Sequence, residues 1–167
     1  MELSKPERLI LSHQYKILEK LYPEEEAVYK QSRKIVEDGY TLNYDEISNH
    51  IYDELTINEC KEVLDILDMH SALFHSVQEL PDEQKVSISF HGFDGNNETD
   101  YMAYTRFYID ELQRYSELTE IAQSKDFNSH YPTLRRYRLM LNEWNQCADK
   151  NNLTREEIER IWNVRVE

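Results

Sequence analysis

Residues 56–81 read TINECKEVLDILDMHSALFHSVQELP, a long helical pattern near the middle of the chain. Thr56 and Glu59 have the spacing of a capping box, in which each side chain satisfies a backbone N–H of the other residue. Pro81 cannot continue a helix, so the pattern ends there. One face at helical spacing carries Cys60, Val63, Leu64, Leu67, His70, Ser71, Phe74 and Val77. We therefore expect a long helix that buries this face.

Upstream of this segment the sequence predicts two further helices. The first begins at Ser4, which forms another capping box with Glu7. Its apolar stripe at helical spacing consists of Leu9, His13, Ile17 and Leu21, with Ile10 and Leu18 beside them. Pro23 opens the second helix and Gly39 stops it. We expect the inner face of the second helix to be formed by Ala27, Val28, Gln31 and Ile35.

A third helix is expected between these two and the long segment. Asn43 and Glu46 are spaced as a capping box, and the stripe continues through Ile47, Ile51 and Leu55. Residues 43–77 then resemble a helix-turn-helix followed by a strand, which is an alternative prediction of a DNA-linked regulator.

Acidic side chains argue against that alternative. The first turns of its second helix contain Asn58, Glu59, Lys61 and Glu62, followed by Asp65 and Asp68. Carboxylates at these positions would oppose contact with DNA phosphates, so the local sequence counts against DNA binding.

Downstream of Pro81 the pattern changes for a short stretch. Residues 86–90, VSISF, alternate with period two, as in a half-buried strand. Residues 91–97, HGFDGNN, are expected to turn into a helix that runs from about Glu98 to Ser116. Pro132 opens a further helix, and a capping box that begins at Thr154 opens the last one.

Composition supports a helical chain. The 167 residues include only 3 Gly and 4 Pro, which helix interiors exclude. A chain of this length fits one domain. We therefore predict an all-α fold in a single domain over residues 1–167, with six or seven helices and at most one short strand at residues 86–90.

Charge restricts the classes of partner. The chain carries 33 acidic and 19 basic side chains, a formal net charge of -14. Such a surface repels phosphate backbones and anionic membranes at long range, which counts against nucleic-acid partners. No apolar run approaches the roughly 18 residues of a membrane span, and no signal peptide is evident, so we expect a cytoplasmic protein. Cys60 and Cys147 form no metal-binding pattern, and we expect no metal and no cofactor.

Two groups of side chains are candidate interaction sites. The first is a stripe of aromatic rings at helical spacing: Tyr101, Tyr104, Tyr108 and Tyr115. We interpret it as part of a core or of a subunit interface, where a tyrosine buries its ring and keeps its hydroxyl bonded. The second is the densest cluster of positive charge, Arg135, Arg136 and Arg138. It could pair with the acidic half of the chain, within one molecule or across a dimer.

His91, Asp94 and Glu98 form a weaker candidate. The segment from Asp94 is similar to a calcium loop, but Thr99 replaces the required Gly and Thr105 replaces the required Glu. We interpret it as a helix cap, because Asp and Asn side chains satisfy free N–H groups at a helix start. The alternative is a hydrolase or metal enzyme with a site built around these three residues.

Three groups of residues occur in an order that is typical of a known family: Arg8 to Ser12 with Gln14 to Lys16, Gly92 to Asp94 with Glu98, Tyr101, Arg106 and Phe107, and Met140 to Asn142 with Trp144. With these residues the chain resembles the YfbU family of small bacterial proteins over its full length. The resemblance implies a helical, self-associated, soluble protein. It implies no reaction, cofactor or catalytic residue.

The functional prediction rests on two features of the sequence: it contains several amphipathic helices, and it contains no recognisable reaction centre. We expect a cytoplasmic, self-associating protein-interaction or regulatory module without catalytic activity. Its expected partners are copies of itself and another, unidentified protein, and we expect neither nucleic acid nor a membrane.

Overall fold

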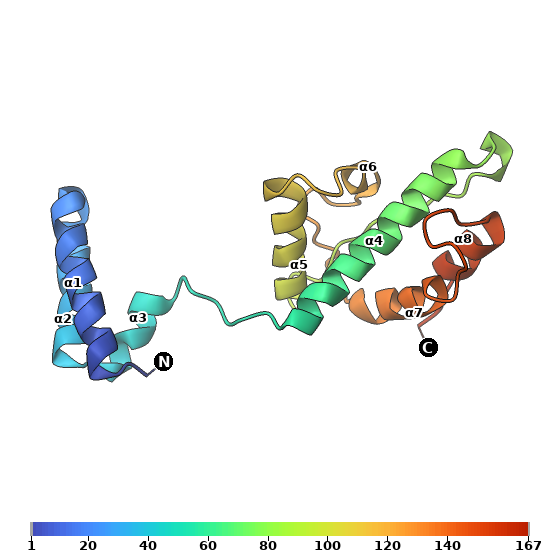
Figure 1. The fold of residues 1–167 in the computed structure, drawn as a ribbon. Coiled ribbons are helices and arrows are strands. Elements are labelled where there is room, and N and C mark those ends of the chain that lie inside the picture. Colours follow the sequence, from blue (N-terminus) through green and yellow to red (C-terminus); the bar gives the residue numbers. More distant parts are fainter. Residues whose placement is uncertain (1, 167) are drawn as a thin grey trace. The chain divides into compact units, whose positions relative to one another are not determined.

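The computed structural model describes residues 2–166 and divides the chain into two compact units. We call Met1–Glu54 the N-terminal unit and Leu55–Glu167 the C-terminal unit, and each is described by itself (Figure 1). The described residues form eight α-helices and no sheet, so the all-α prediction is confirmed. The prediction of a single domain over residues 1–167 stays a prediction.

The N-terminal unit begins with a helical hairpin. Helix α1 is Lys5–Leu21 and α2 is Glu26–Asp38, and the two lie side by side in Figure 1. The predicted capping box of Ser4 and Glu7 starts α1. A short 3₁₀ helix, Pro23–Glu25, makes the turn between the helices. The sequence therefore predicted the start of the hairpin correctly.

Gly39 ends α2 as predicted, with a φ of +74° in the left-handed region. Beside it, the Arg8 guanidinium of α1 donates hydrogen bonds to the Val36 and Glu37 carbonyl oxygens, at 2.6 and 2.7 Å. These carbonyls lie in the last turn of α2, where a positive charge is favourable. Arg8 therefore joins the two helices at this end of the hairpin, before the 3₁₀ turn Thr41–Asn43.

The third predicted helix is much shorter than expected. Helix α3 is Tyr44–Ser48, so Ile51 and Leu55 lie outside it. The Asn43 side chain donates to Glu46 Oε1 at 2.6 Å but makes no capping bond to the backbone, so that capping box is wrong. Tyr44 is the only buried side chain of α3. A short helix is stable only where the protein buries one of its faces. Residues 49–54, which follow α3, are exposed, so nothing stabilises a longer helix there.

The helix-turn-helix alternative loses its first helix for the same reason. Helix α4 is Ile57–Glu79, and it belongs to the C-terminal unit, whereas α3 belongs to the N-terminal unit. Residues 49–56 between them are not helical. The short turn that a helix-turn-helix requires within residues 43–77 is therefore not formed.

The long helix α4 is the centre of the C-terminal unit. The predicted capping box of Thr56 and Glu59 is present, and the helix ends two residues before Pro81. In Figure 1, α4 lies between α5 and α6 on one side and α7 and α8 on the other. These helices span Thr99–Arg106 (α5), Leu118–Ile121 (α6), Leu134–Trp144 (α7) and Arg155–Trp162 (α8).

The predicted strand at residues 86–90 is not formed. After the 3₁₀ turn Asp82–Gln84, this segment is extended but pairs only at Phe90, in an isolated parallel bridge with Ala122. Phe90 is fully buried in the core, while the preceding residues meet no neighbouring strand. The alternating pattern predicts a strand within a sheet. In the structure it corresponds to a segment of which only the last residue, Phe90, pairs with another segment and lies in the core.

Gly92 allows the chain to turn directly after Phe90. Its φ is +75°, and a Cβ atom there would lie 1.9 Å from the Phe127 carbonyl oxygen. Phe127 also accepts a hydrogen bond from the Phe93 N–H, at 2.9 Å. Only a glycine fits between these backbones.

The helix predicted from Glu98 to Ser116 ends earlier. Helix α5 passes into a π-helical turn, Phe107–Glu111, and the helical pattern stops there. Gln113 and Tyr115 follow with φ values of 53° and 55°, which no helix contains. The Tyr115 hydroxyl donates to Asp68 Oδ1 of α4 at 2.6 Å, so a tertiary contact holds this irregular turn.

Candidate functional site

The tyrosine stripe lies against α4 within the C-terminal unit. The Tyr101 hydroxyl donates to Glu62 Oε2 at 2.7 Å, and Tyr115 reaches Asp68 two turns further along α4. Between them, the Tyr104 and Tyr108 rings pack edge to face with centroids 5.0 Å apart. All four rings are buried or half-buried. The stripe covers the core of its own unit and leaves little aromatic surface for a partner.

Burial and carboxylates perturb the ionisation of these tyrosines. Burial, and then the hydrogen bond to Glu62, raise the pKa of Tyr101 to about 12. Burial and the Asp68 carboxylate raise the pKa of Tyr115 as well. Both hydroxyls are therefore neutral donors at neutral pH, which suits a structural role.

The arginine cluster is divided among three environments. Arg138 makes a bidentate contact with Glu62, at 2.7 and 2.8 Å. Arg136 donates to the Trp162 carbonyl oxygen at 2.9 Å and lies over the Trp162 ring. Arg135 is exposed. The three side chains therefore do not converge on a single anion site, and two of them hold α7 against α4 and α8.

Glu62 joins the two predicted groups. Its carboxylate accepts from both Tyr101 and Arg138, so one side chain of α4 contacts α5 and α7. The Arg138 guanidinium, more than any other group, holds the pKa of Glu62 below its ordinary value. This network ties three helices together.

Glu98 acts on the backbone rather than on a ligand. Its buried carboxylate accepts hydrogen bonds from the backbone N–H groups of Asp94, Thr133 and Leu134, at 2.9 to 3.1 Å. The Thr133 hydroxyl donates to the same carboxylate at 3.0 Å. Thr133 and Leu134 form the start of α7, where free N–H groups need acceptors. Glu98 therefore supplies a cap for a helix distant in sequence.

Asp94 and His91 are also occupied by their neighbours. Asp94 accepts from the Asn96 backbone at 3.1 Å and from the Asn97 side chain. The side-chain bond from Asn97 contributes most to lowering the pKa of Asp94. The His91 ring contacts Ser89 at 3.0 Å through Nε2 and the Tyr131 hydroxyl through Nδ1. These contacts fit the helix-cap interpretation.

The three residues therefore do not assemble a metal site. Across residues 2–166 no three His, Cys, Asp or Glu side chains are grouped so that they could hold a metal ion. The alternative of an enzyme around His91, Asp94 and Glu98 gains no support from this arrangement.

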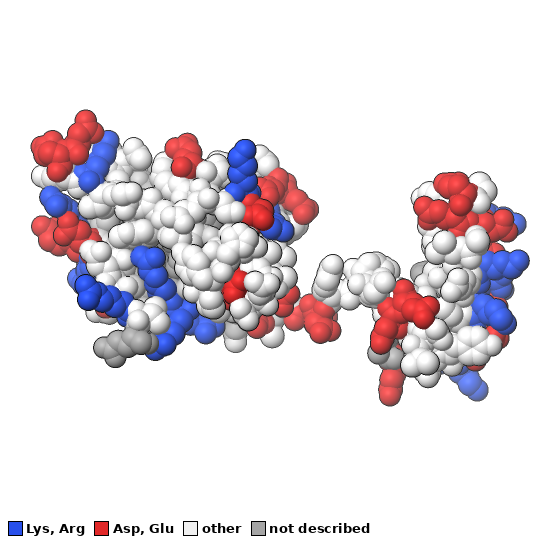
Figure 2. All heavy atoms as spheres, turned by 180° about the vertical axis from the view of Figure 1, so that it is seen from behind, with Lys and Arg blue, Asp and Glu red and all other residues white. Residues whose placement is uncertain are grey.

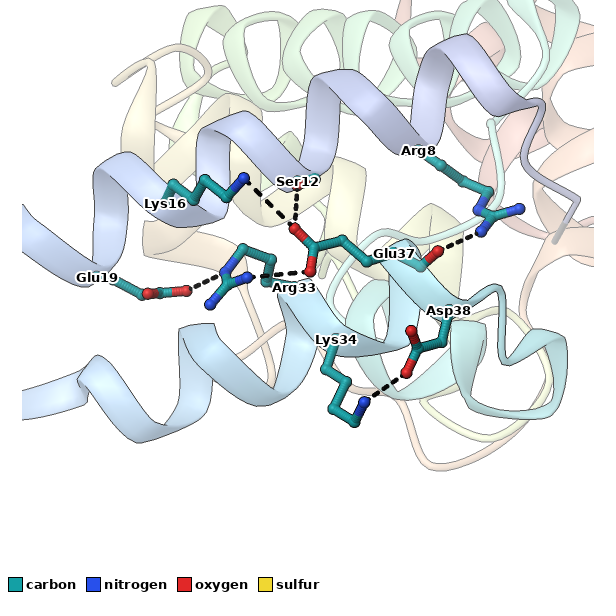
Figure 3. Close-up of polar contacts among 8 residues, drawn as sticks. All are labelled: Arg8, Ser12, Lys16, Glu19, Arg33, Lys34, Glu37 and Asp38. Carbon is teal, nitrogen blue, oxygen red and sulfur yellow. Dashed lines mark hydrogen bonds and ion pairs between the residues drawn. The ribbon is translucent and has the colours of Figure 1, made fainter.

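The N-terminal hairpin contains a feature that the sequence pattern did not identify as a site. A network of polar side chains joins α1 and α2 across the seam between them (Figure 3), beside the stacked rings of Tyr15 and Tyr29. Arg33 donates to Glu19 at 2.6 Å and to Glu37 at 3.0 Å. The Ser12 hydroxyl donates to the other oxygen of Glu37 at 2.7 Å, and Lys16 lies 3.6 Å from that oxygen.

Apolar side chains of α1 lie on the opposite face. Leu9, Ile10, Ile17 and Leu21 expose between 57% and 64% of their surfaces, whereas Ser12 and Glu19 are buried. The stripe that the sequence analysis identified is therefore real, but it does not pack against α2. We call Leu9, Ile10, His13, Ile17 and Leu21 the outer face of α1.

The predicted inner face of α2 is wrong in the same way. Ala27, Val28 and Gln31 are exposed, and Ile35 alone among the four predicted residues is buried. The side of α2 that faces α1 combines polar and apolar side chains: Arg33 and Glu37 bond to α1, Val36 is fully buried beside them, and Tyr29 stacks on Tyr15 of α1. Periodicity identifies a stripe but not the element that covers it. The polar pairs Ser12 with Glu37 and Glu19 with Arg33 were the signal that could have revealed the true seam.

A basic hollow lies beside the outer face. Its volume is about 320 Å³, and the residues that line it are Lys5, Arg8, Leu9, Ser12, His13, Lys16, Val36 and Glu37. Glu37 is the only carboxylate among them, and Arg33, Ser12 and Lys16 already contact it. Figure 2 shows the Lys and Arg side chains of the N-terminal unit mostly along one edge. The hollow therefore suits a carboxylate next to an apolar group.

Membrane insertion has no candidate segment in the part of the chain that the structure describes. None of its helices combines the length and the apolar character that crossing a bilayer requires.

Comparison with known proteins gives one consistent result. A family model described as the YfbU domain matches residues 1–164, which span the N-terminal unit and all but the last three residues of the C-terminal unit. The chain is also similar to UPF0304 protein MJECS11 of Methanocaldococcus jannaschii. The two are 44% identical over 169 residues, which cover 97% of this chain and 99% of that relative.

Proposed function

The chain belongs to the YfbU family, and we propose that it is a self-associating interaction module that docks through the outer face of α1. The observation that carries the proposal is the arrangement of the hairpin, with a polar seam inside and an apolar face outside. Apolar surface on a folded protein gains free energy when another surface removes it from water.

The N-terminal unit has little core of its own. Among residues 2–166, 26 apolar side chains are buried, and only three of them, Ile35, Val36 and Tyr44, belong to this unit. Of the 15 large apolar side chains that are exposed within the same range, ten belong to it, although the unit spans only residues 1–54. Units of this size are marginally stable even with a full core. A docking partner would supply the missing burial.

In this proposal the polar and aromatic groups of the C-terminal unit stabilise its own fold and do not bind a partner. Its tyrosine and arginine groups hold α4, α5, α7 and α8 together, and its polar clusters cap helices. We propose a cytoplasmic location, which fits the two free thiols, Cys60 and Cys147, since disulfides are rare in reducing compartments.

Light scattering on the full chain tests the proposal. We expect wild-type protein to exceed the 20.2 kDa chain mass at micromolar concentration. Ile17→Glu places a charge in the outer face and should shift the mass towards one chain. Leu112→Glu is the matched control, because Leu112 is exposed on the other unit. A wild-type monomer at every concentration, or equal masses for wild type and Ile17→Glu, would contradict the proposal.

A further inference from the structure

We propose that the outer face of α1 binds residues 42–54 of a second copy of this chain, and that the two copies exchange these contacts reciprocally. This inference rests on the proposed function, since it names the partner of the same face. We call residues 42–54 the acidic segment. Three observations support this pairing. Helix α1 is basic, the acidic segment carries negative charge, and both expose apolar side chains.

The first observation is that α1 is locally basic in an acidic protein. Lys5, Lys16 and Lys20 lie along one edge of the outer face at helical spacing. The two carboxylates of α1 are already engaged, Glu7 in the capping box and Glu19 with Arg33. Lys16 lies 3.6 Å from Glu37, so the outer face presents its apolar side chains beside two further positive charges, Lys5 and Lys20.

The second observation is the opposite composition of the acidic segment. It contains four carboxylates, Asp45, Glu46, Asp53 and Glu54, and no Lys or Arg. Its apolar side chains Leu42, Ile51 and Tyr52 expose between 71% and 91% of their surfaces. A segment of this kind matches the basic hollow, which can accept a carboxylate beside Leu9. Complementary charge of this type sets the orientation of an interface and raises its association rate.

The third observation is that the two surfaces do not cover each other within one chain. Both belong to the N-terminal unit, and there the apolar side chains named for each surface are exposed, although Tyr44 within the acidic segment is buried. A second copy supplies each surface with its complement. Because every copy carries both surfaces, a twofold arrangement forms the same contact twice and closes without free ends.

Charge reversal on each surface tests the pairing. The first variant is Lys5→Glu/Lys20→Glu, and the second is Asp53→Lys/Glu54→Lys. Each places like charges across both contacts of a homodimer, and we expect each to weaken self-association by about tenfold or more. A mixture of the two variants should restore it. In the mixed dimer, reversed α1 meets reversed segment, and native α1 meets native segment.

Sedimentation velocity of each variant alone and of the equimolar mixture provides the readout. We expect species near 20.2 kDa for each variant alone and near twice that mass for the mixture. Lys61→Glu/Lys125→Glu is the control for the first variant, because it makes the same change in net charge at exposed residues of the other unit. Far-ultraviolet circular dichroism verifies that every variant is folded.

The outcomes separate this inference from the proposed function. If wild type associates and Ile17→Glu prevents it, but the mixture stays monomeric, the pairing with the acidic segment is wrong and docking through α1 stands. If wild type is monomeric throughout, both are wrong. Cosedimentation with phosphatidylserine vesicles tests whether the outer face binds a membrane instead of a second copy. A monomeric wild type that binds these vesicles, and an Ile17→Glu variant that does not, would assign the face to a membrane instead.

Discussion

The Arg33 guanidinium lies 2.6 Å from the Glu19 carboxylate at the centre of the seam between α1 and α2. Both side chains are largely shielded from water by the hairpin itself. A helical hairpin usually places its apolar stripes at this position. Here an ion pair takes the position and the apolar stripe of α1 faces outward, which is why we infer docking on another chain.

The first prediction concerns this ion pair. Arg33→Leu removes the partner of a shielded carboxylate and should destabilise the N-terminal unit. Glu19→Leu/Arg33→Leu replaces both charges with apolar groups and should recover part or all of the loss, since a shielded pair gains little over an apolar one. Urea unfolding followed by circular dichroism measures both variants. A double variant less stable than Arg33→Leu would contradict this view of the seam.

The second prediction concerns pH. His70 is fully buried in α4, where its Nδ1 donates to the Ile66 carbonyl and its Nε2 has no partner among the described residues. Burial lowers the pKa of His70 from 6.5 to about 4. As the pH falls through this window, the unfolded chain takes up a proton before the folded chain does. The free energy of unfolding of the C-terminal unit should therefore fall by about 3 kcal/mol between pH 6.5 and pH 4. Above pH 7 His70 is neutral in the folded and the unfolded chain, so it should cause no change with pH there.

Tryptophan fluorescence in urea measures this loss, since both tryptophans lie in the C-terminal unit. His70→Phe keeps a ring against Phe90 and Tyr137 but cannot titrate, so its stability should depend less on pH in the same window. His50→Gln, at an exposed histidine, is the control and should behave as wild type. Parallel pH profiles for wild type and His70→Phe would refute the assignment.

The third prediction separates a helix cap from a ligand site. Glu98→Ala leaves the N–H groups of Asp94, Thr133 and Leu134 without their acceptor and should cost about 2 to 4 kcal/mol. Glu98→Gln keeps one oxygen and should cost less. Urea unfolding of both variants, with the exposed Glu111→Gln as control, measures the effect. Wild-type stability in Glu98→Ala would show that the carboxylate does not hold the start of α7.

The fourth prediction compares two glycines with nearly equal φ. Gly39→Ala places a Cβ 2.9 Å from the Arg8 guanidinium, a side chain that can shift, and should cost about 1 to 2 kcal/mol, mainly for the left-handed backbone. Gly92→Ala meets the Phe127 backbone at 1.9 Å and should cost about 3 kcal/mol or more. Thermal unfolding ranks the two variants. Equal losses would mean that the backbone at Gly92 can move aside.

Local chemistry made part of this fold predictable. The capping boxes that begin at Ser4, Thr56 and Thr154 are all present, because residues three positions apart form them without help from the rest of the chain. The buried face of α4 was predictable in part: Val63, Leu67, His70, Phe74 and Val77 are buried as expected. Ile66, Met69 and Leu73 lie off that stripe and are buried too, because helices cover α4 on more than one side. Both features lie within single elements.

Features that depend on tertiary neighbours could not be predicted in this way. The outer face of α1 has the periodicity of a core stripe, and only the polar partners Arg33 and Glu37 on α2 reveal that it points outward. Residues 86–90 alternate like a strand, but the described part of the chain offers no second strand for them to pair with. The role of Glu98 needed α7 to be placed beside it.

Hydrogen exchange of α1 at two protein concentrations shows whether another copy of the chain covers the outer face. If another copy covers the outer face, the amides of α1 should be better protected at the concentration where the protein is assembled than where light scattering gives 20.2 kDa. The amides of α4 should be equally protected at both concentrations. Protection of α1 that is the same in the monomer and at high concentration would contradict the account.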